Sequence, residues 1–195
     1  MIPKVLTLAL PALLLMTTVS DDLESYRAEG DQITDATQAI LLRELTAAMQ
    51  AGGPPNAVAY CSSRAQLIMD SVSEVRGVDI RRATDRTRNL RDAFADEREQ
   101  KAFDRLKAMM AEGGSPQTMV DDEGRTVEYY RPIVIKEQCL ACHGTPGKTI
   151  SDETLEVIKE AYPNDLATGY AVGDLRGMWH LTFKKVDRQL KPIDH

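Results

Sequence analysis

Two of the three cysteines in this 195-residue chain lie three positions apart and are followed at once by a histidine, in the segment Cys139-Leu140-Ala141-Cys142-His143. This pattern is the attachment signature of c-type haem. Two thiols at this spacing reach the two vinyl groups of one porphyrin, and the adjacent imidazole then binds the iron. Gly144 permits a tight exit, and Pro146 prevents a long helix. We therefore expect a compact turn that carries one covalently attached haem c, with His143 as an iron ligand.

Other uses of these thiols are open from the residues alone. A disulfide between Cys139 and Cys142 and a thioredoxin-like redox centre are less favoured, the second because no βαβ pattern surrounds the motif. The serious alternative is zinc, since Cys61, Cys139, Cys142 and His143 would make a closed Cys3His tetrahedron. Zinc does not need a histidine directly after the second cysteine, so the motif favours haem.

The first 20 residues have the pattern of an export signal. Lys4 supplies a positive charge, an apolar run follows from Val5 to Met16, and Thr18-Val19-Ser20 offers small residues to a signal peptidase. The run is short for a transmembrane helix, which needs about 20 apolar residues. We expect a cleaved signal peptide over residues 1–20, a single mature domain over 21–195 and a periplasmic location, with an uncleaved anchor as the alternative.

Composition limits the function classes. Hydrophobic residues make up 43% and charged residues 28%, which is typical of a globular domain. A net charge of -6 argues against nucleic acid as a partner. The chain shows no catalytic nucleophile, acid/base pair or phosphate loop, so we expect no enzyme activity. The expected partner is a redox or signalling protein, and a homodimer is also possible.

Hydrophobic periodicity predicts an α+β domain with helices packed on an antiparallel sheet. Helices are expected over residues 31–50, from Pro54 to Gly77, over 93–112, and from Ser151 to Pro163. Strands are expected over residues 78–83, on either side of a turn at 121–124, over 169–172, and over 178–186. The second strand of the first hairpin alternates through Val127, Tyr129, Arg131, Ile133 and Ile135.

The second axial position of a haem iron decides much of its function. Cys61 is the unpaired thiol, and it lies on an apolar stripe of the second helix. The stripe comprises Val58, Cys61, Ala65, Ile68, Val72 and Val75. Cys61 is therefore either a small buried hydrophobe or the second iron ligand. His180 faces away from Trp179 and its apolar neighbours, His195 ends the chain, and methionines such as Met69 and Met110 have core spacing.

The chain also resembles a family of small bacterial haem proteins that have a PAS-like fold and are often attached to sensor modules. The resemblance extends from about Asp31 to Phe183. It rests on Tyr129-Tyr130-Arg131-Pro132-Ile133 before the cysteine motif, on Arg88-Asn89, and on the run from Tyr162-Pro163-x-Asp165-x-Ala167-x-Gly169-Tyr170 to Gly173-Asp174-x-Arg176-Gly177. The chain departs from the family at Leu90, Asp92 and Phe94, in the loop after Arg88. The resemblance implies a single PAS-like domain whose iron is held by His143 and Cys61.

Two functions follow from these expectations. In a redox or gas sensor, reduction or a diatomic ligand would displace Cys61, because a thiolate favours ferric iron. In a simple electron-transfer cytochrome, both ligands would stay fixed. The arginines near residue 88 are usually a solvated charge run, but haem propionates need cationic partners. We expect Arg88 to be one of them.

Overall fold

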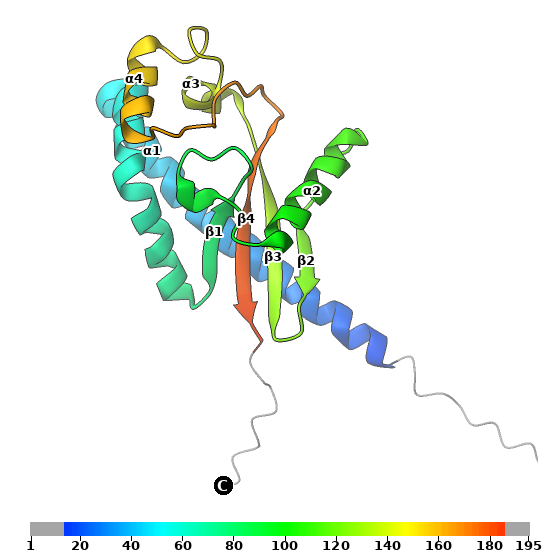
Figure 1. Ribbon diagram of the computed structural model, residues 1–195. Helices are drawn as coiled ribbons and strands as arrows, with labels where there is room; N and C mark the ends of the chain where they lie inside the picture. Colours follow the sequence, from blue (N-terminus) through cyan, green and yellow to red (C-terminus); the bar gives the residue numbers. More distant parts are fainter. Residues whose placement is uncertain (1–13, 186–195) are drawn as a thin grey trace, which may run out of the picture.

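A four-stranded antiparallel sheet lies at the centre of the chain, with the strand order β1-β4-β3-β2 (Figure 1). The computed structural model describes residues 14–185, and the side chains from residue 22 onward. The strands are β1 (Asp79–Ala83), β2 (Met119–Asp122), β3 (Thr126–Val134) and β4 (Leu175–Lys184). β4 pairs with β1 on one side and with β3 on the other. The expected α+β class with an antiparallel sheet is confirmed, and the arrangement is consistent with a PAS-like fold.

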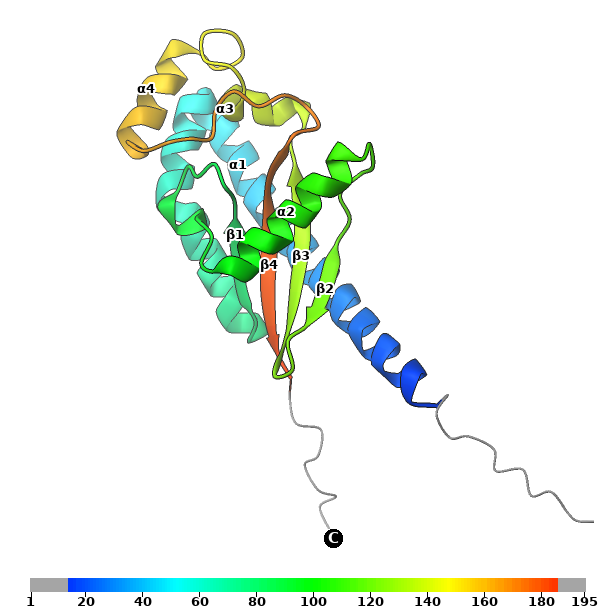
Figure 2. The ribbon, with the colours of Figure 1, turned by 45° about the vertical axis from the view of Figure 1, so that its right-hand side comes forward.

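Helices cover both faces of this sheet. Figures 1 and 2 show α1 (Leu14–Arg76) behind the strands and α2 (Glu97–Ala111) across their front. The short helices α3 (Leu140–His143) and α4 (Asp152–Ala161) lie together at one end of the sheet, next to the bend of α1. Two 3-10 turns, η1 (Leu90–Asp92) and η2 (Glu137–Cys139), complete the elements of the described residues.

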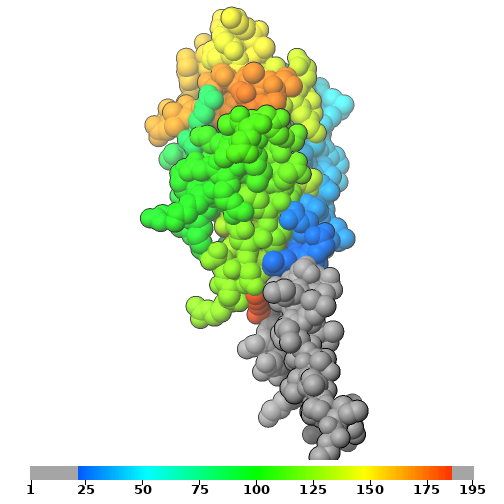
Figure 3. Space-filling model, turned by 90° about the vertical axis from the view of Figure 1, so that its right-hand side faces the viewer, coloured from blue at the N-terminus to red at the C-terminus, as the bar shows by residue number. Residues whose placement is uncertain are grey.

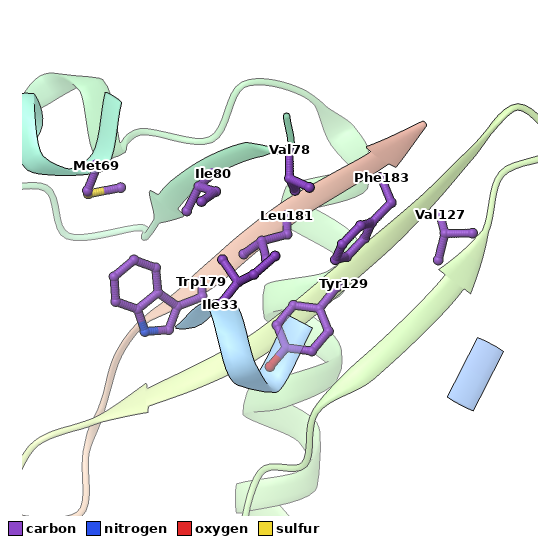
Figure 4. Packing of buried hydrophobic residues seen from close by; sticks show 9 residues of the cluster. All are labelled: Ile33, Met69, Val78, Ile80, Val127, Tyr129, Trp179, Leu181 and Phe183. Carbon is purple, nitrogen blue, oxygen red and sulfur yellow. The ribbon is translucent and has the colours of Figure 1, made fainter. Parts of the chain in front are cut away.

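The hydrophobic core is divided between the two faces. Under α1, Trp179, Leu181 and Phe183 of β4 pack with Tyr129 and Ile33, as Figure 4 shows. The opposite face packs against α2 through a second cluster, which comprises Ala83, Ala102, Phe103, Leu106, Met119, Tyr130 and Met178. The shared face expected for Trp179, Leu181 and Phe183 is therefore confirmed. Because α2 covers the other face, residues 127–130 of β3 are all buried.

The long helix α1 is two helices joined by a kink at Gly52 and Gly53. Gly53 has φ of 68°, a left-handed conformation that favours glycine, and Pro54 and Pro55 follow it. The C-terminal arm of α1 (residues 54–76) then returns beside β1 (Figure 1). The two helices expected here are confirmed, although the first begins at Leu14 rather than near residue 31.

Most of the expected signal peptide, residues 1–13, lies outside the described residues, and its cleavage stays a prediction. Between residues 14 and 185, no helix is both long enough and apolar enough to cross a membrane.

Two expectations about local structure were wrong. Residues 169–172 form no strand, because the amide of Tyr170 donates to the carbonyl of His143 (3.0 Å) instead of joining the sheet. Val75 is 80% exposed, so the apolar stripe of the C-terminal arm ends before it. The helix expected from Ser151 is confirmed, and Ser151 caps it, since its side chain accepts from the amide of Thr154.

Candidate functional site

The cysteine motif forms a compact turn directly after β3. η2 and α3 together make the cysteine turn (residues 137–144), which closes where the amide of Gly144 donates to the carbonyl of Leu140 at 2.9 Å. A Cβ at Gly144 would lie 2.7 Å from that carbonyl oxygen and would collide with Thr149 Oγ1. Only glycine therefore fits at position 144, which agrees with the tight turn expected there.

The segment after α4 holds this turn in place. The amides of Gly169 and Tyr170 donate to the carbonyls of Gly144 (2.6 Å) and His143 (3.0 Å). The space-filling view in Figure 3 shows this segment, in orange, on the surface between α2 and the loop that follows the cysteine turn. The turn is thus fixed by backbone hydrogen bonds from a part of the chain more than 20 residues away.

His143 is oriented by one specific contact. Its Nδ1 lies 2.8 Å from the carbonyl oxygen of Ala167, so Nδ1 carries the proton and Nε2 keeps a free lone pair. The ring of Tyr170 meets the imidazole edge-on, with 6.3 Å between ring centroids. Burial, together with the charges of Arg88 and Arg176, lowers the pKa of His143 well below its ordinary value. The neutral imidazole that results is the form that binds a metal.

The three cysteines have free thiols and are all half-buried. Cys139 packs near Ile135 and Tyr170, whereas Cys142 packs near Val58 of the C-terminal arm. Burial raises the pKa of Cys61, and the nearby charges of Arg82 and Arg88 oppose that rise. Burial also raises the pKa of Cys142, and the charge of Cys61 adds to the effect. Cys61 lies about one turn after Val58, on the part of α1 that packs against Cys142 and α4.

A cavity of about 160 Å³ lies against the cysteine turn. Cys139 and His143 line it on one side, Ile133 and Ile135 provide apolar surface, and Arg82 and Arg176 bring positive charge. Arg82 Nε is buried and has no hydrogen-bond partner among the residues from 22 to 185. Arg82 also pairs with Asp92, another residue of the cavity lining, through Nη2 at 3.5 Å. A buried donor without a partner is costly, so Arg82 Nε is available to an acidic oxygen of a ligand.

Arg88 lies close to the turn, where it is held by a carboxylate and two carbonyls. Its guanidinium pairs with Asp165 (Nε to Oδ1, 3.0 Å) and donates through Nη2 to the carbonyls of Cys142 (2.7 Å) and Ala167 (3.3 Å). The side chains of Arg88 and Asp165 are only 10% and 8% exposed. A propionate contact for Arg88 stays a prediction, and its contacts in the structure are those of a brace.

The other candidate iron ligands lie away from the turn or outside the described residues. His180 is buried under α2, with Nδ1 2.7 Å from Glu99 Oε1 and Nε2 2.9 Å from Glu128 Oε2. Both ring nitrogens are thus engaged. Met69 belongs to the core under α1, and His195 falls outside the described residues.

The zinc alternative needs four donors within about 2.0–2.3 Å of one ion. Within residues 22–185, no three His, Cys, Asp or Glu side chains are grouped closely enough to hold a metal ion. A haem would not need these donors around one ion. The two thiols would bind the vinyl groups of the porphyrin, and the imidazole would bind the iron.

Comparison with known proteins now gives the family. The model of the Tll0287-like family matches residues 14–183. The chain belongs to the Tll0287-like family. Among solved structures, it is similar to the crystal structure of the cyanobacterial heme-protein Tll0287, with 26% identity, 65% of this chain and 72% of that chain covered, and a TM-score of 0.54. No curated protein matches the chain. The resemblance to a haem-protein family seen in the motifs is confirmed.

Several site residues of this Tll0287-like chain have roles that the sequence did not reveal. Arg82, Asp165 and Arg176 were given no role, although Asp165 and Arg176 belong to the run that carries the family resemblance. The charge of Asp165 and Arg176 within that run was the only sign of a role. The partner of Asp165 could not be identified from the sequence, since Arg88 lies 77 positions before it.

Proposed function

We propose that this chain binds one haem c, attached through Cys139 and Cys142, with His143 and Cys61 as the axial ligands. The observation that best supports this proposal is the orientation of His143. The carbonyl of Ala167 binds Nδ1, so Nε2 remains available, and Cys139 and Cys142 of the same turn have free thiols. Membership of a family whose solved relative is a heme-protein supports the same cofactor. Export expected from residues 1–20 agrees with it, because haem c is attached outside the cytoplasm.

The residues around the turn fit the group. Cys139 and His143 share a cavity with Arg82 and Arg176, and these guanidiniums could pair with the haem propionates. Within residues 22–185, Arg82 Nε has no hydrogen-bond partner although Nη2 pairs with Asp92 at 3.5 Å, whereas Asp165 holds both Nε and Nη2 of Arg88. When bound, the haem would supply one-electron redox chemistry and an axial site for small ligands.

We favour a redox or gas sensor over a simple electron carrier. His143 is held on two sides, since its Nδ1 donates to the carbonyl of Ala167 and its own carbonyl accepts from the amide of Tyr170. Cys61 is carried by the C-terminal arm of α1, which follows a glycine kink and two prolines. A thiolate binds ferric iron more strongly than ferrous iron, so reduction would weaken the bond to Cys61.

Replacing Cys61 with serine tests the ligation. Cys61→Ser should keep the covalent haem, because both attachment thiols are untouched. It should change the low-spin spectrum, remove the sulfur-to-iron charge-transfer band and raise the reduction potential. Ser62→Ala on the exposed side of the same arm is the matched control and should change none of these. An unaltered spectrum and potential in Cys61→Ser would make Cys61 a packing residue.

Carbon monoxide distinguishes the sensor from the electron carrier. The reduced protein should bind it and show a shifted Soret band, since a weakened Cys61 bond leaves an axial position that carbon monoxide can take. A reduced spectrum that carbon monoxide does not alter would favour two fixed ligands and electron transfer.

A further inference from the structure

The carbonyl of Ala167 accepts two hydrogen bonds of different kinds. His143 Nδ1 approaches it at 2.8 Å and Arg88 Nη2 at 3.3 Å. A carbonyl has two lone pairs, so it can accept both bonds at once. Arg88 Nη2 has two hydrogens for three acceptors, so its bond to Ala167 shares a hydrogen with Asp165 or with the carbonyl of Cys142. The proposed iron ligand and a buried cation are therefore joined through one oxygen atom.

Asp165 completes this arrangement. Its Oδ1 accepts from the amide of Ala167 at 3.0 Å and from Arg88 Nε at 3.0 Å, and its Oδ2 accepts from Arg88 Nη2 at 3.2 Å. The same guanidinium donates to the carbonyl of Cys142 at 2.7 Å. One ion pair thus holds both Ala167, whose carbonyl orients His143, and Cys142, which precedes His143 in the chain.

We propose that the Arg88–Asp165 pair is a positioning pair that sets the reduction potential of the haem iron through the shared carbonyl of Ala167. This inference rests on the proposed haem site. A hydrogen bond from the outer nitrogen of a metal-bound histidine makes the ligand more electron-rich. Arg88 draws electron density from the accepting carbonyl and weakens that bond, so His143 donates less charge to the iron.

The two partners act with opposite signs. Arg88 disfavours the extra positive charge of ferric iron, both through the carbonyl and directly through space, and thereby raises the potential. Asp165 stabilises ferric iron and lowers the potential. Because both side chains are nearly buried, solvent screens these charges only weakly.

Replacing each partner with a neutral residue tests the proposal by the direction in which the midpoint potential shifts. We expect Arg88→Gln to lower the midpoint potential, Asp165→Asn to raise it, and the double variant to lie between them. Arg88→Lys keeps the charge and should lie closer to the wild type than Arg88→Gln. The control is the exposed Arg105–Asp121 pair, where Arg105→Gln and Asp121→Asn should leave the potential unchanged. Potentials are measured by spectroelectrochemical titration of protein with one attached haem per chain.

A purely structural brace would give a different pattern. Shifts of the same sign in Arg88→Gln and Asp165→Asn, or no shift in either, would overturn the proposal. Removing one partner from a buried pair can prevent folding. If both single variants lose their haem, Arg88→Lys carries the test. Its midpoint potential should lie below that of the wild type, because lysine keeps the charge but loses the planar fork that reaches the Ala167 carbonyl, and a potential at or above that of the wild type would overturn the proposal. Absence of attached haem in the wild type would instead overturn the proposed function.

Discussion

His180→Phe is expected to lower the free energy of unfolding by about 1.5–3 kcal/mol, the range for a lost hydrogen bond to a charged group, since Arg81 and Arg98 still pair with the two carboxylates beside it. His180 lies between two carboxylates, Glu99 and Glu128, which are 0% and 1% exposed. Phenylalanine keeps the stacking on Tyr130, where the ring centroids are 4.6 Å apart, but it donates no hydrogen bond. Both carboxylates would then lose a charged donor inside the interface between α2 and the sheet.

Urea unfolding of the wild type and His180→Phe measures this cost directly. Arg105→Gln breaks an exposed ion pair and is the control, with an expected loss of about 0–1 kcal/mol. A His180→Phe loss as small as the control's would contradict a structural role for the buried cluster.

The same cluster predicts a pH dependence of stability. Burial lowers the pKa of His180, but its hydrogen bonds to Glu128 and Glu99 outweigh burial and raise that pKa. Its stabilising contribution is therefore complete below the unfolded value of about 6.5 and is lost as the pH rises through the folded pKa. Burial raises the pKa of Glu128, but hydrogen bonds led by that from His180 lower it to about 2. That contribution is complete above about pH 4.5 and is lost as the pH falls toward 2.

The cluster should therefore stabilise the fold most between about pH 4.5 and 6.5. The difference in unfolding free energy between the wild type and His180→Phe should be largest in that window and should shrink at alkaline pH. A difference that is constant from acid to alkaline pH would contradict a charged His180.

Removing both attachment thiols should abolish covalent haem completely. In the Cys139→Ala/Cys142→Ala variant no thioether can form, so any haem that binds should leave the polypeptide in acidified acetone. Each single variant keeps one thiol and should retain a reduced amount of attached haem. The measurement is haem-dependent peroxidase staining of the denatured chain on a gel.

Cys61→Ala is the matched control for this loss, because it also removes one half-buried thiol. It should keep the full covalent stain. Stain that persists in the double variant would contradict attachment at the cysteine turn.

Features of the fold that depend on local chemistry could be predicted from the sequence. The Ser151 cap, the turn between β2 and β3 and the helix break at Gly53 each follow from a few neighbouring residues. The strand wrongly expected over residues 169–172 depends on a distant partner. Tyr170 lies outside the sheet because its amide binds His143, 27 positions before it.

In the candidate site too, local features could be predicted from the sequence and long-range contacts could not. The cysteine turn could be recognised because its chemistry fixes the spacing of its residues. The buried environment of His180 could not, since Glu99 reaches it from α2 across 81 positions. The brace between Arg88 and Asp165 could not be predicted for the same reason, since the two residues are 77 positions apart.

The account is tested most directly by the intact mass of the denatured wild-type protein, produced in cells that carry a cytochrome c maturation system. The account predicts one species whose mass is that of the mature polypeptide plus one haem. A polypeptide of unmodified mass, from native protein that is colourless and carries one zinc ion per chain, would contradict the haem site and establish the Cys3His alternative.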